Sequence, residues 1–194
     1  MSTAEATDRR AGSRASNESA RRLRLAEMLL QTYRRLSSLD SLDATLEALV
    51  TIMAEQSGAE WSTIFLNDAR NGELFSRVLH GQHTREIRIL NTEGIAGRVF
   101  RTGEAMVIED AYASPWFNPS VDAATGLTTR NILAVPIRKS SGEVLGVCQV
   151  VNKRQGPFTD ENREVLESLA TQASISLESG QYAERMERTR REAL

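Results

Sequence analysis

The chain has 194 residues, of which 40% are hydrophobic and 26% are charged, and its formal net charge is −2. These values are normal for a globular domain with its own core, and they give no electrostatic sign of a nucleic-acid surface. The single cysteine, Cys148, excludes an intrachain disulfide and suits a reducing compartment. No stretch approaches about 18 consecutive apolar residues, so the sequence predicts a cytoplasmic protein without a membrane span.

The beginning of the chain is predicted to lead into a helix. Residues 1–17 are polar and show no apolar periodicity, so we expect them to be disordered. From residue 18 to residue 40 the pattern becomes helical, because Leu25, Leu29 and Leu36 fall on one face. We interpret residues 18–40 as an N-terminal signalling helix that precedes the domain.

A second helix and a β-rich region follow. The helix carries an apolar stripe that starts at Leu42, and Gly58 is expected to end it. Alternating or apolar runs predict strands at residues 62–66, 74–79, 85–89, 106–108, 132–138 and 144–151. Asn71-Gly72, between the first two strands, favours a tight hairpin turn. Hairpin-linked strands flanked by helices predict an antiparallel sheet of the α+β class.

Two features in the middle of the chain favour a small-anion site. Gly94-Ile95-Ala96-Gly97 opens a short predicted helix, whose first N–H groups and dipole favour a phosphate. The long irregular segment at residues 110–131 is typical of a lid, and it carries clustered polar side chains at Asp122, Thr125 and Thr129. Each feature has a simpler alternative, which is a glycine turn for the first and a solvated loop for the second.

The last helix is predicted to start after Thr159, a good N-cap residue, and its apolar pattern continues past Gly180. A helix of roughly thirty residues often belongs to a coiled coil. We therefore expect residues 179–194 to form a connecting helix, and the terminal helices to support a parallel homodimer.

No catalytic set is visible in the sequence. His80 and His83 flank Gly81 at a strand end, where a polar hairpin tip is favoured over a metal site. Cys148 lies in the middle of a predicted strand, as expected for a buried small hydrophobe. There is no nucleophile elbow and no P-loop. We expect no enzymatic activity, no metal, no cofactor and no nucleic-acid or membrane partner.

Several short runs together carry a family resemblance. They are Glu86-Ile87-Arg88-Ile89, Gly94-Ile95-Ala96-Gly97, Asp110-Ala111-Tyr112, Arg130-Asn131-Ile132-Leu133, Pro136-Ile137, Gly146-Val147 and Val151-Asn152-Lys153. Residues 41–178 thereby resemble a GAF domain, and they are most similar to the cyclic-nucleotide-binding GAF domains of phosphodiesterases and bacterial adenylyl cyclases. The resemblance implies a six-stranded antiparallel sheet with helices on both faces and a ligand enclosed between the sheet and the lid.

The resemblance also implies roles for individual residues. The implied ligand contacts are Thr63, Leu79, His80, Ile95, Ala96, Asp122, Thr125, Thr129 and Gln149. The Asn-Lys, Phe, Asp-Glu signature of this subfamily is matched by Asn152, Lys153 and Phe158, whereas Asn162 and Arg163 stand at its acidic positions. In the family the lysine is thought to form a salt bridge with the acidic partner, so here Lys153 is expected to pair with Asp160 or with nothing.

The function implied by the resemblance is regulation by a small molecule. The domain is expected to bind a cyclic nucleotide, either cAMP or cGMP, and to pass the signal through its terminal helices to an output domain such as a cyclase. The alternative is a GAF dimerisation module that binds no ligand.

Overall fold

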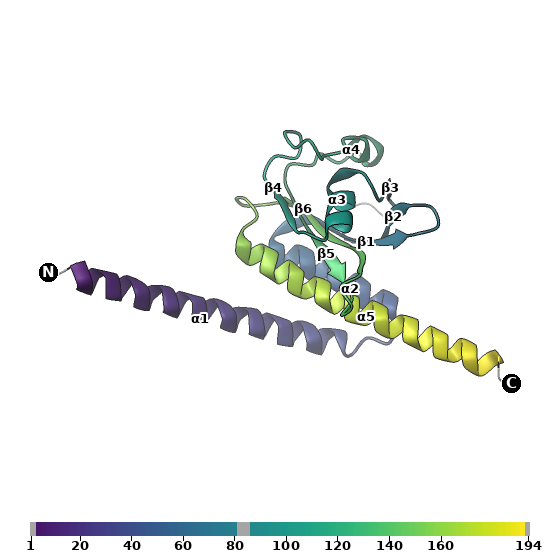
Figure 1. Cartoon of the computed structure of the whole chain (residues 1–194), viewed down its shortest axis with the longest axis horizontal. Helices are drawn as coiled ribbons and strands as arrows, with labels where there is room; N and C mark the ends of the chain where they lie inside the picture. Colours follow the sequence, from purple (N-terminus) through teal and green to yellow (C-terminus); the bar gives the residue numbers. More distant parts are fainter. Residues whose placement is uncertain (1–2, 81–85, 193–194) are drawn as a thin grey trace. The chain divides into compact units, whose positions relative to one another are not determined.

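The computed structural model describes residues 3–80 and 86–192, and the chain divides into two compact units, residues 1–38 and 39–194. The first unit is a single helix, α1 (Thr3–Leu36) (Figure 1). The expectation of disorder over residues 1–17 differs from this result, because residues 3–17 continue the helix. Missing apolar periodicity argues against packing, but it does not argue against a helix, since alanine and arginine, which are strong helix formers, make up seven of the fifteen residues 3–17.

The second unit begins with α2 (Leu42–Ser57), which ends at Gly58 as the sequence predicts. The Ser41 hydroxyl accepts a hydrogen bond from the Ala44 N–H at 3.1 Å, and Gly58 ends the helix in the left-handed region at φ 64°. The remaining elements are β1 (Ala59–Asp68), β2 (Glu73–His80), β3 (Arg88–Leu90), α3 (Gly94–Thr102), β4 (Met106–Ile108), α4 (Ser120–Thr125), β5 (Ile132–Arg138), β6 (Val144–Lys153) and α5 (Asp160–Glu192).

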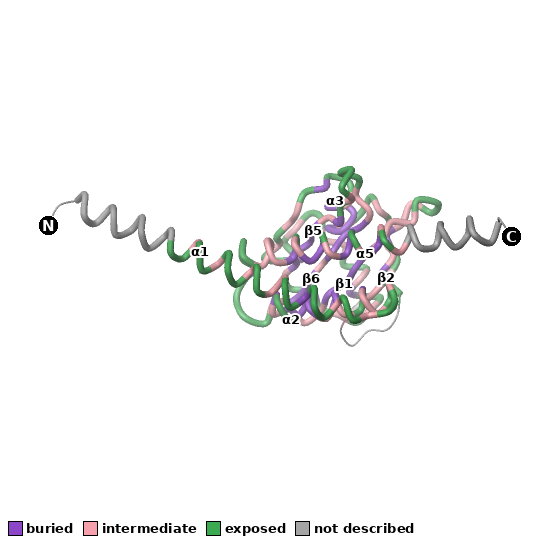
Figure 2. The backbone as a smooth tube through the Cα atoms, turned by 90° about the horizontal axis from the view of Figure 1, so that it is seen from below, coloured by how far each residue is buried: buried purple, intermediate pink, exposed green. Residues whose placement is uncertain are grey.

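The six strands form one antiparallel sheet in the order β3-β2-β1-β6-β5-β4. Helices α2 and α5 cover one face, and α3 and α4 lie over the other (Figure 1). Buried residues concentrate along the strands between these two layers (Figure 2). The α+β architecture with helices on both faces is therefore confirmed. No helix in the described part of the chain has an apolar stretch long enough to cross a bilayer.

Alternation along β1 decides which side chains face each helical layer. Ser62 points toward α2, because its hydroxyl donates a hydrogen bond to the Val50 carbonyl. Thr63 and Phe65 therefore point to the α3 side, where the register places Gln149 of β6 opposite Thr63. The face under α3 thus combines an apolar floor with polar residues from the central strands.

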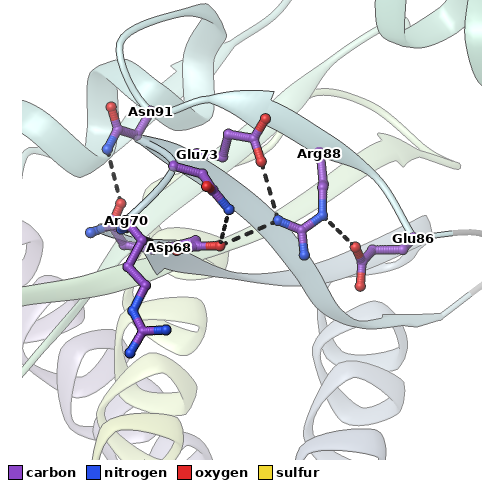
Figure 3. A network of polar contacts seen from close by, with 8 residues as sticks. Asp68, Arg70, Glu73, Glu86, Arg88 and Asn91 are labelled. Carbon is purple, nitrogen blue, oxygen red and sulfur yellow. Dashed lines mark hydrogen bonds and ion pairs between the residues drawn. The ribbon is translucent and has the colours of Figure 1, made fainter.

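The short edge strand β3 is held by charge as well as by its ladder. The Arg88 guanidinium contacts the carboxylates of Glu73 at 3.1 Å, Glu86 at 2.6 Å and Asp68 at 3.5 Å (Figure 3). The sequence predicted this strand at residues 85–89, whereas the ladder covers only residues 88–90. Residue 85 lies outside the described residues. The network fixes β3 beside β2, where it borders the cavity described next.

Candidate functional site

A cavity lies between the sheet and the layer of α3 and α4, on the face that Phe65 occupies. Its volume is about 70 Å³, and its walls come from the central strands, the stretch before and at the start of α3, and the segment 110–131, which we call the lid. Most of the lining side chains are apolar, with Gln149, Asp122 and Thr129 among the polar ones. We call this space the inner cavity.

A larger groove of about 590 Å³ opens beside the inner cavity, between β3 and α4. The residues that line both spaces are Ile87, Ile89, Glu93, Asn118 and Val121. Since they border both, they form the constriction between the inner cavity and this outer groove. The inner cavity and the outer groove are thus adjacent on the side of α4.

The start of α3 is directed to the inner cavity, as the glycine-rich motif predicts. Ile95 and Ala96 are 4% and 3% exposed, and both line the cavity. Glu93 is the N-cap residue and its side chain makes no capping hydrogen bond. The N–H groups of the first turn have no intrahelical acceptor, so they remain suited to an anion or a carbonyl oxygen.

The lid is fixed by hydrogen bonds that converge on one carboxylate. Asp122 of α4 is 6% exposed, and it accepts hydrogen bonds from the Thr129 N–H and hydroxyl, both at 2.6 Å. The Tyr112 hydroxyl donates to the same carboxylate at 3.1 Å, and this hydrogen bond raises the pKa of Tyr112. Asp122 and Thr129 are thus brought together at the inner cavity, but they bond to one another.

Two further contacts attach the lid. The Arg98 guanidinium of α3 lies over the Trp116 ring at 3.9 Å, a cation–π contact. Asn152 of β6 donates to the Thr128 carbonyl at 2.8 Å and accepts from the Arg130 N–H at 2.7 Å, so it holds both neighbours of Thr129. Asn152 adopts a positive φ of 60°, which asparagine tolerates better than most residues.

The rest of the signature differs from expectation. Lys153 was expected to pair with Asp160 or to have no partner. Instead its ammonium donates a hydrogen bond to the Asn162 side-chain oxygen. Phe158 is buried beside that ammonium, 5.9 Å from Nζ to the ring centroid. Asp160 instead forms an exposed ion pair with Arg163 at 3.3 Å. The Asn162 amide therefore stands where the signature has an acidic residue. Its oxygen can still accept the hydrogen bond from Lys153.

The other predicted contacts are spread more widely. Gln149 lines the inner cavity, while Thr125 lines only the outer groove and donates to the Val121 carbonyl at 2.7 Å. Thr63 is buried on the cavity face but does not line the cavity. His80 pairs with Ser62 in the ladder, which puts it on the α2 side. The side chain of Leu79 lies outside the described residues, so its role and that of His80 stay predictions.

The sequence did not point to much of the cavity wall. The unpredicted lining residues include Phe65, Ile87, Phe117, Asn118 and Val121. The period of two in the strands gives a partial signal, because Phe65 follows Thr63 by two residues and shares its face. Apolar residues in the lid give no such signal, since an apolar cavity wall and a packed core have the same composition.

The electrostatics of the inner cavity are acidic. Glu93 and Asp122 contribute carboxylates, and no Lys, Arg or His of the described residues lines it. A bound phosphate would therefore be held by backbone N–H groups rather than by a cation. Cys148 lies opposite Ile64 on the other face of the sheet, and burial raises the pKa of its thiol. Across the described residues, no group of three His, Cys, Asp or Glu side chains is placed to hold a metal ion.

The arrangement of sheet, α3 and lid agrees with the family comparison, in which the profile of the GAF domain matches residues 41–177. The chain belongs to the GAF domain family. It is 31% identical over 183 residues to a probable 3′,5′-cyclic phosphodiesterase, pde-5, of Caenorhabditis elegans, covering 88% of this chain and 25% of that protein. It is 39% identical over 111 residues to dual 3′,5′-cyclic-AMP and -GMP phosphodiesterase 11 of Drosophila melanogaster, covering 57% of this chain and 8% of that protein. The chain therefore spans a quarter or less of these relatives.

Solved structures agree on the GAF fold. The GAF domain of a phosphoenolpyruvate-protein phosphotransferase from Coxiella burnetii superposes with a TM-score of 0.75 at 20% identity, covering 83% of this chain and 96% of that one. Free methionine-R-sulfoxide reductase from Neisseria meningitidis gives a TM-score of 0.70 at 23% identity, covering 82% of this chain and 91% of that one. At these identities the likeness concerns the fold alone, which proteins of different function share.

Proposed function

We propose that this GAF domain is a regulatory module that binds a cyclic nucleotide, cAMP or cGMP, and passes the bound state through its terminal helices to an output domain such as a cyclase. The observation that carries the proposal is that Ile95 and Ala96 of α3 line the same cavity as Asp122 and Thr129 of the lid. The names of the phosphodiesterase relatives support the ligand class. The single free cysteine suits the cytoplasm as the place of action.

The cavity chemistry suits the parts of a cyclic nucleotide. The apolar walls fit the flat purine, the Gln149 amide can hydrogen-bond the ribose or the purine edge, and the first N–H groups of α3 suit the phosphodiester. Because Glu93 opposes the phosphate charge, we expect cyclic nucleotides to bind with modest affinity.

The lid has to move for such a ligand to enter. Binding pockets for small molecules typically have about 300 to 1,000 Å³, whereas the inner cavity has about 70 Å³. Outward movement of α4 would join the inner cavity to the outer groove, since Val121 lines both. In this proposal the lid of the described structure is in its closed position.

The test is thermal and chemical unfolding with cAMP, cGMP and, as a control, 5′-AMP. A nucleotide at 100 times its dissociation constant should add about 2.7 kcal/mol to the free energy of unfolding. Val121→Trp fills the constriction and should abolish that gain, while Ala123→Trp changes an exposed α4 residue that lines neither space. Equal gains in both variants, or no gain with either cyclic nucleotide at millimolar concentration, would contradict the proposal.

The second candidate is a dimerisation module that binds no ligand, and the small inner cavity favours it. On α1, Leu23, Ala26, Leu30 and Tyr33 recur at the a and d spacing of a heptad, and the three large residues are 60%, 51% and 63% exposed. A parallel homodimer is therefore part of both proposals. Sedimentation equilibrium with Leu30→Glu tests it, and a dimer that ignores cyclic nucleotides would favour the second candidate.

A further inference from the structure

The carboxylate of Asp122 joins three separate segments around the inner cavity. It belongs to α4, while its donors come from Thr129, just before β5, and from Tyr112, just after β4. The Oδ2 atom accepts both the Thr129 N–H and the Tyr112 hydroxyl, and Oδ1 accepts the Thr129 hydroxyl. A buried carboxylate with three donors resists displacement, since moving it would expose or unpair every one of these groups.

Tyr112 differs from the other two members because it stands outside the cavity. It is 60% exposed and does not line the inner cavity or the outer groove. Its ring packs against Phe117 with centroids 4.9 Å apart, and Phe117 is part of the cavity wall. One exposed side chain therefore contacts both the buried carboxylate and an aromatic residue of the wall.

We propose that Tyr112 is a positioning residue that holds α4 closed through the carboxylate of Asp122. Outward movement of α4 carries Asp122 away from Thr129 and Tyr112 and breaks their three hydrogen bonds together. The Tyr112 hydroxyl thus favours the closed lid without touching a ligand. The consequence for ligand exchange rests on the proposed function, but the consequence for lid opening does not.

The first test needs no ligand and uses hydrogen exchange of the Thr129 amide, measured by NMR. Tyr112→Phe keeps the ring against Phe117 and removes only the hydroxyl. Losing one hydrogen bond to a charged group at this partly exposed position should raise the exchange rate of the Thr129 amide about fivefold to tenfold. Amides in β5, such as that of Leu133, should keep their protection, because the effect is local opening rather than global unfolding.

Thr51→Val on α2 is the control, since it removes a hydroxyl that donates to the Glu47 carbonyl at 3.0 Å on the helix that covers the other face of the sheet. Its Thr129 amide should exchange like that of the original protein. An exchange rate in Tyr112→Phe that stays within about twofold of the original would overturn the inference. The same holds if protection falls equally at Thr129 and Leu133, because Tyr112 would then contribute only to global stability.

The second test is stopped-flow binding of a fluorescent cyclic nucleotide. Tyr112→Phe should raise the dissociation rate constant about fivefold to tenfold, while the Thr51→Val control leaves it unchanged. Faster Thr129 exchange in a protein that binds no cyclic nucleotide would support the positioning role and contradict the proposed function. If the protein binds a cyclic nucleotide but Tyr112→Phe leaves Thr129 exchange and nucleotide dissociation unaltered, the proposed function is supported and the positioning role is contradicted.

Discussion

Replacing Asn162 by aspartate should restore the missing ion pair and stabilise the domain. Asn162 lies in the first turn of α5, where its side-chain oxygen accepts from the Lys153 ammonium, from the Thr159 N–H at 3.0 Å and from the Thr159 hydroxyl at 3.2 Å. Asn162→Asp keeps this acceptor and adds a negative charge beside a cation and at the positive end of a helix dipole.

The magnitude follows from these two electrostatic effects. A partly exposed ion pair contributes up to about 1 kcal/mol, and an acidic residue in the first helical turn contributes about 0.3 to 1 kcal/mol. Asp160 and Glu161 already stand in that turn and repel a third carboxylate, so we expect a net gain of about 1 kcal/mol. This gain corresponds to an increase in melting temperature of about 2 to 4 °C.

The assay is urea unfolding of the four proteins in a double-mutant cycle that pairs Asn162→Asp with Lys153→Met. The gain should be about 1 kcal/mol beside Lys153 and about half that in the Lys153→Met background. The new carboxylate should have a lowered folded-state pKa beside Lys153, so its contribution is present at pH 7 and lost as the pH falls below about 4. An unchanged or lowered stability at pH 7, or an equal gain in both backgrounds, would refute this reasoning.

Three other substitutions test the fold around the site. Gly146→Ala should cost more than about 3 kcal/mol or prevent folding, since its Cβ would stand 2.0 Å from the Phe65 carbonyl oxygen; urea unfolding with a loss under 1 kcal/mol would contradict this. Glu60→Gln should reduce the free energy of unfolding at pH 7, because the hydrogen bond from Arg130 lowers the pKa of Glu60 and so stabilises the folded state while Glu60 is charged. This stabilisation is lost on protonation, so the stabilities of the variant and the original protein should converge as the pH falls below about 4, and a stability difference that stays constant across pH would refute the prediction. Cys148→Ser should cost about 1 to 3 kcal/mol and leave ligand binding unchanged, because the buried thiol lies on the far face of the sheet; weakened binding would contradict this.

The sequence predicted those parts of the fold whose signals are local. Gly58 ends α2 because a left-handed cap favours glycine, and Asn71-Gly72 lies in the turn between β1 and β2. The N-terminus of α3 was found in the same way. Each of these features depends on a few neighbouring residues, so no knowledge of the tertiary structure is needed to predict it.

The remaining parts depend on long-range register. A β-bulge shifts the pairing of β2 with β1 between Ile64 and Phe65, so that Ser76 rather than Arg77 stands opposite Phe65. Counting by twos along β2 therefore cannot tell which of its residues face the cavity. Similarly, nothing in the sequence pairs Tyr112 with Asp122, because their hydrogen bond requires the segment after β4 to meet α4.

The closed lid has a quantitative consequence for sensing. If only the open form admits a ligand, the apparent dissociation constant equals the intrinsic one divided by the open fraction. An open fraction of about 1% would weaken apparent affinity about a hundredfold, so under the proposed function the contacts that close the lid would set the ligand concentration to which the domain responds. In this chain those contacts converge on Asp122, and Asn152 holds the residues on either side of its partner Thr129. Changes at these positions should therefore tune sensitivity without altering the cavity wall that α3 and the sheet provide.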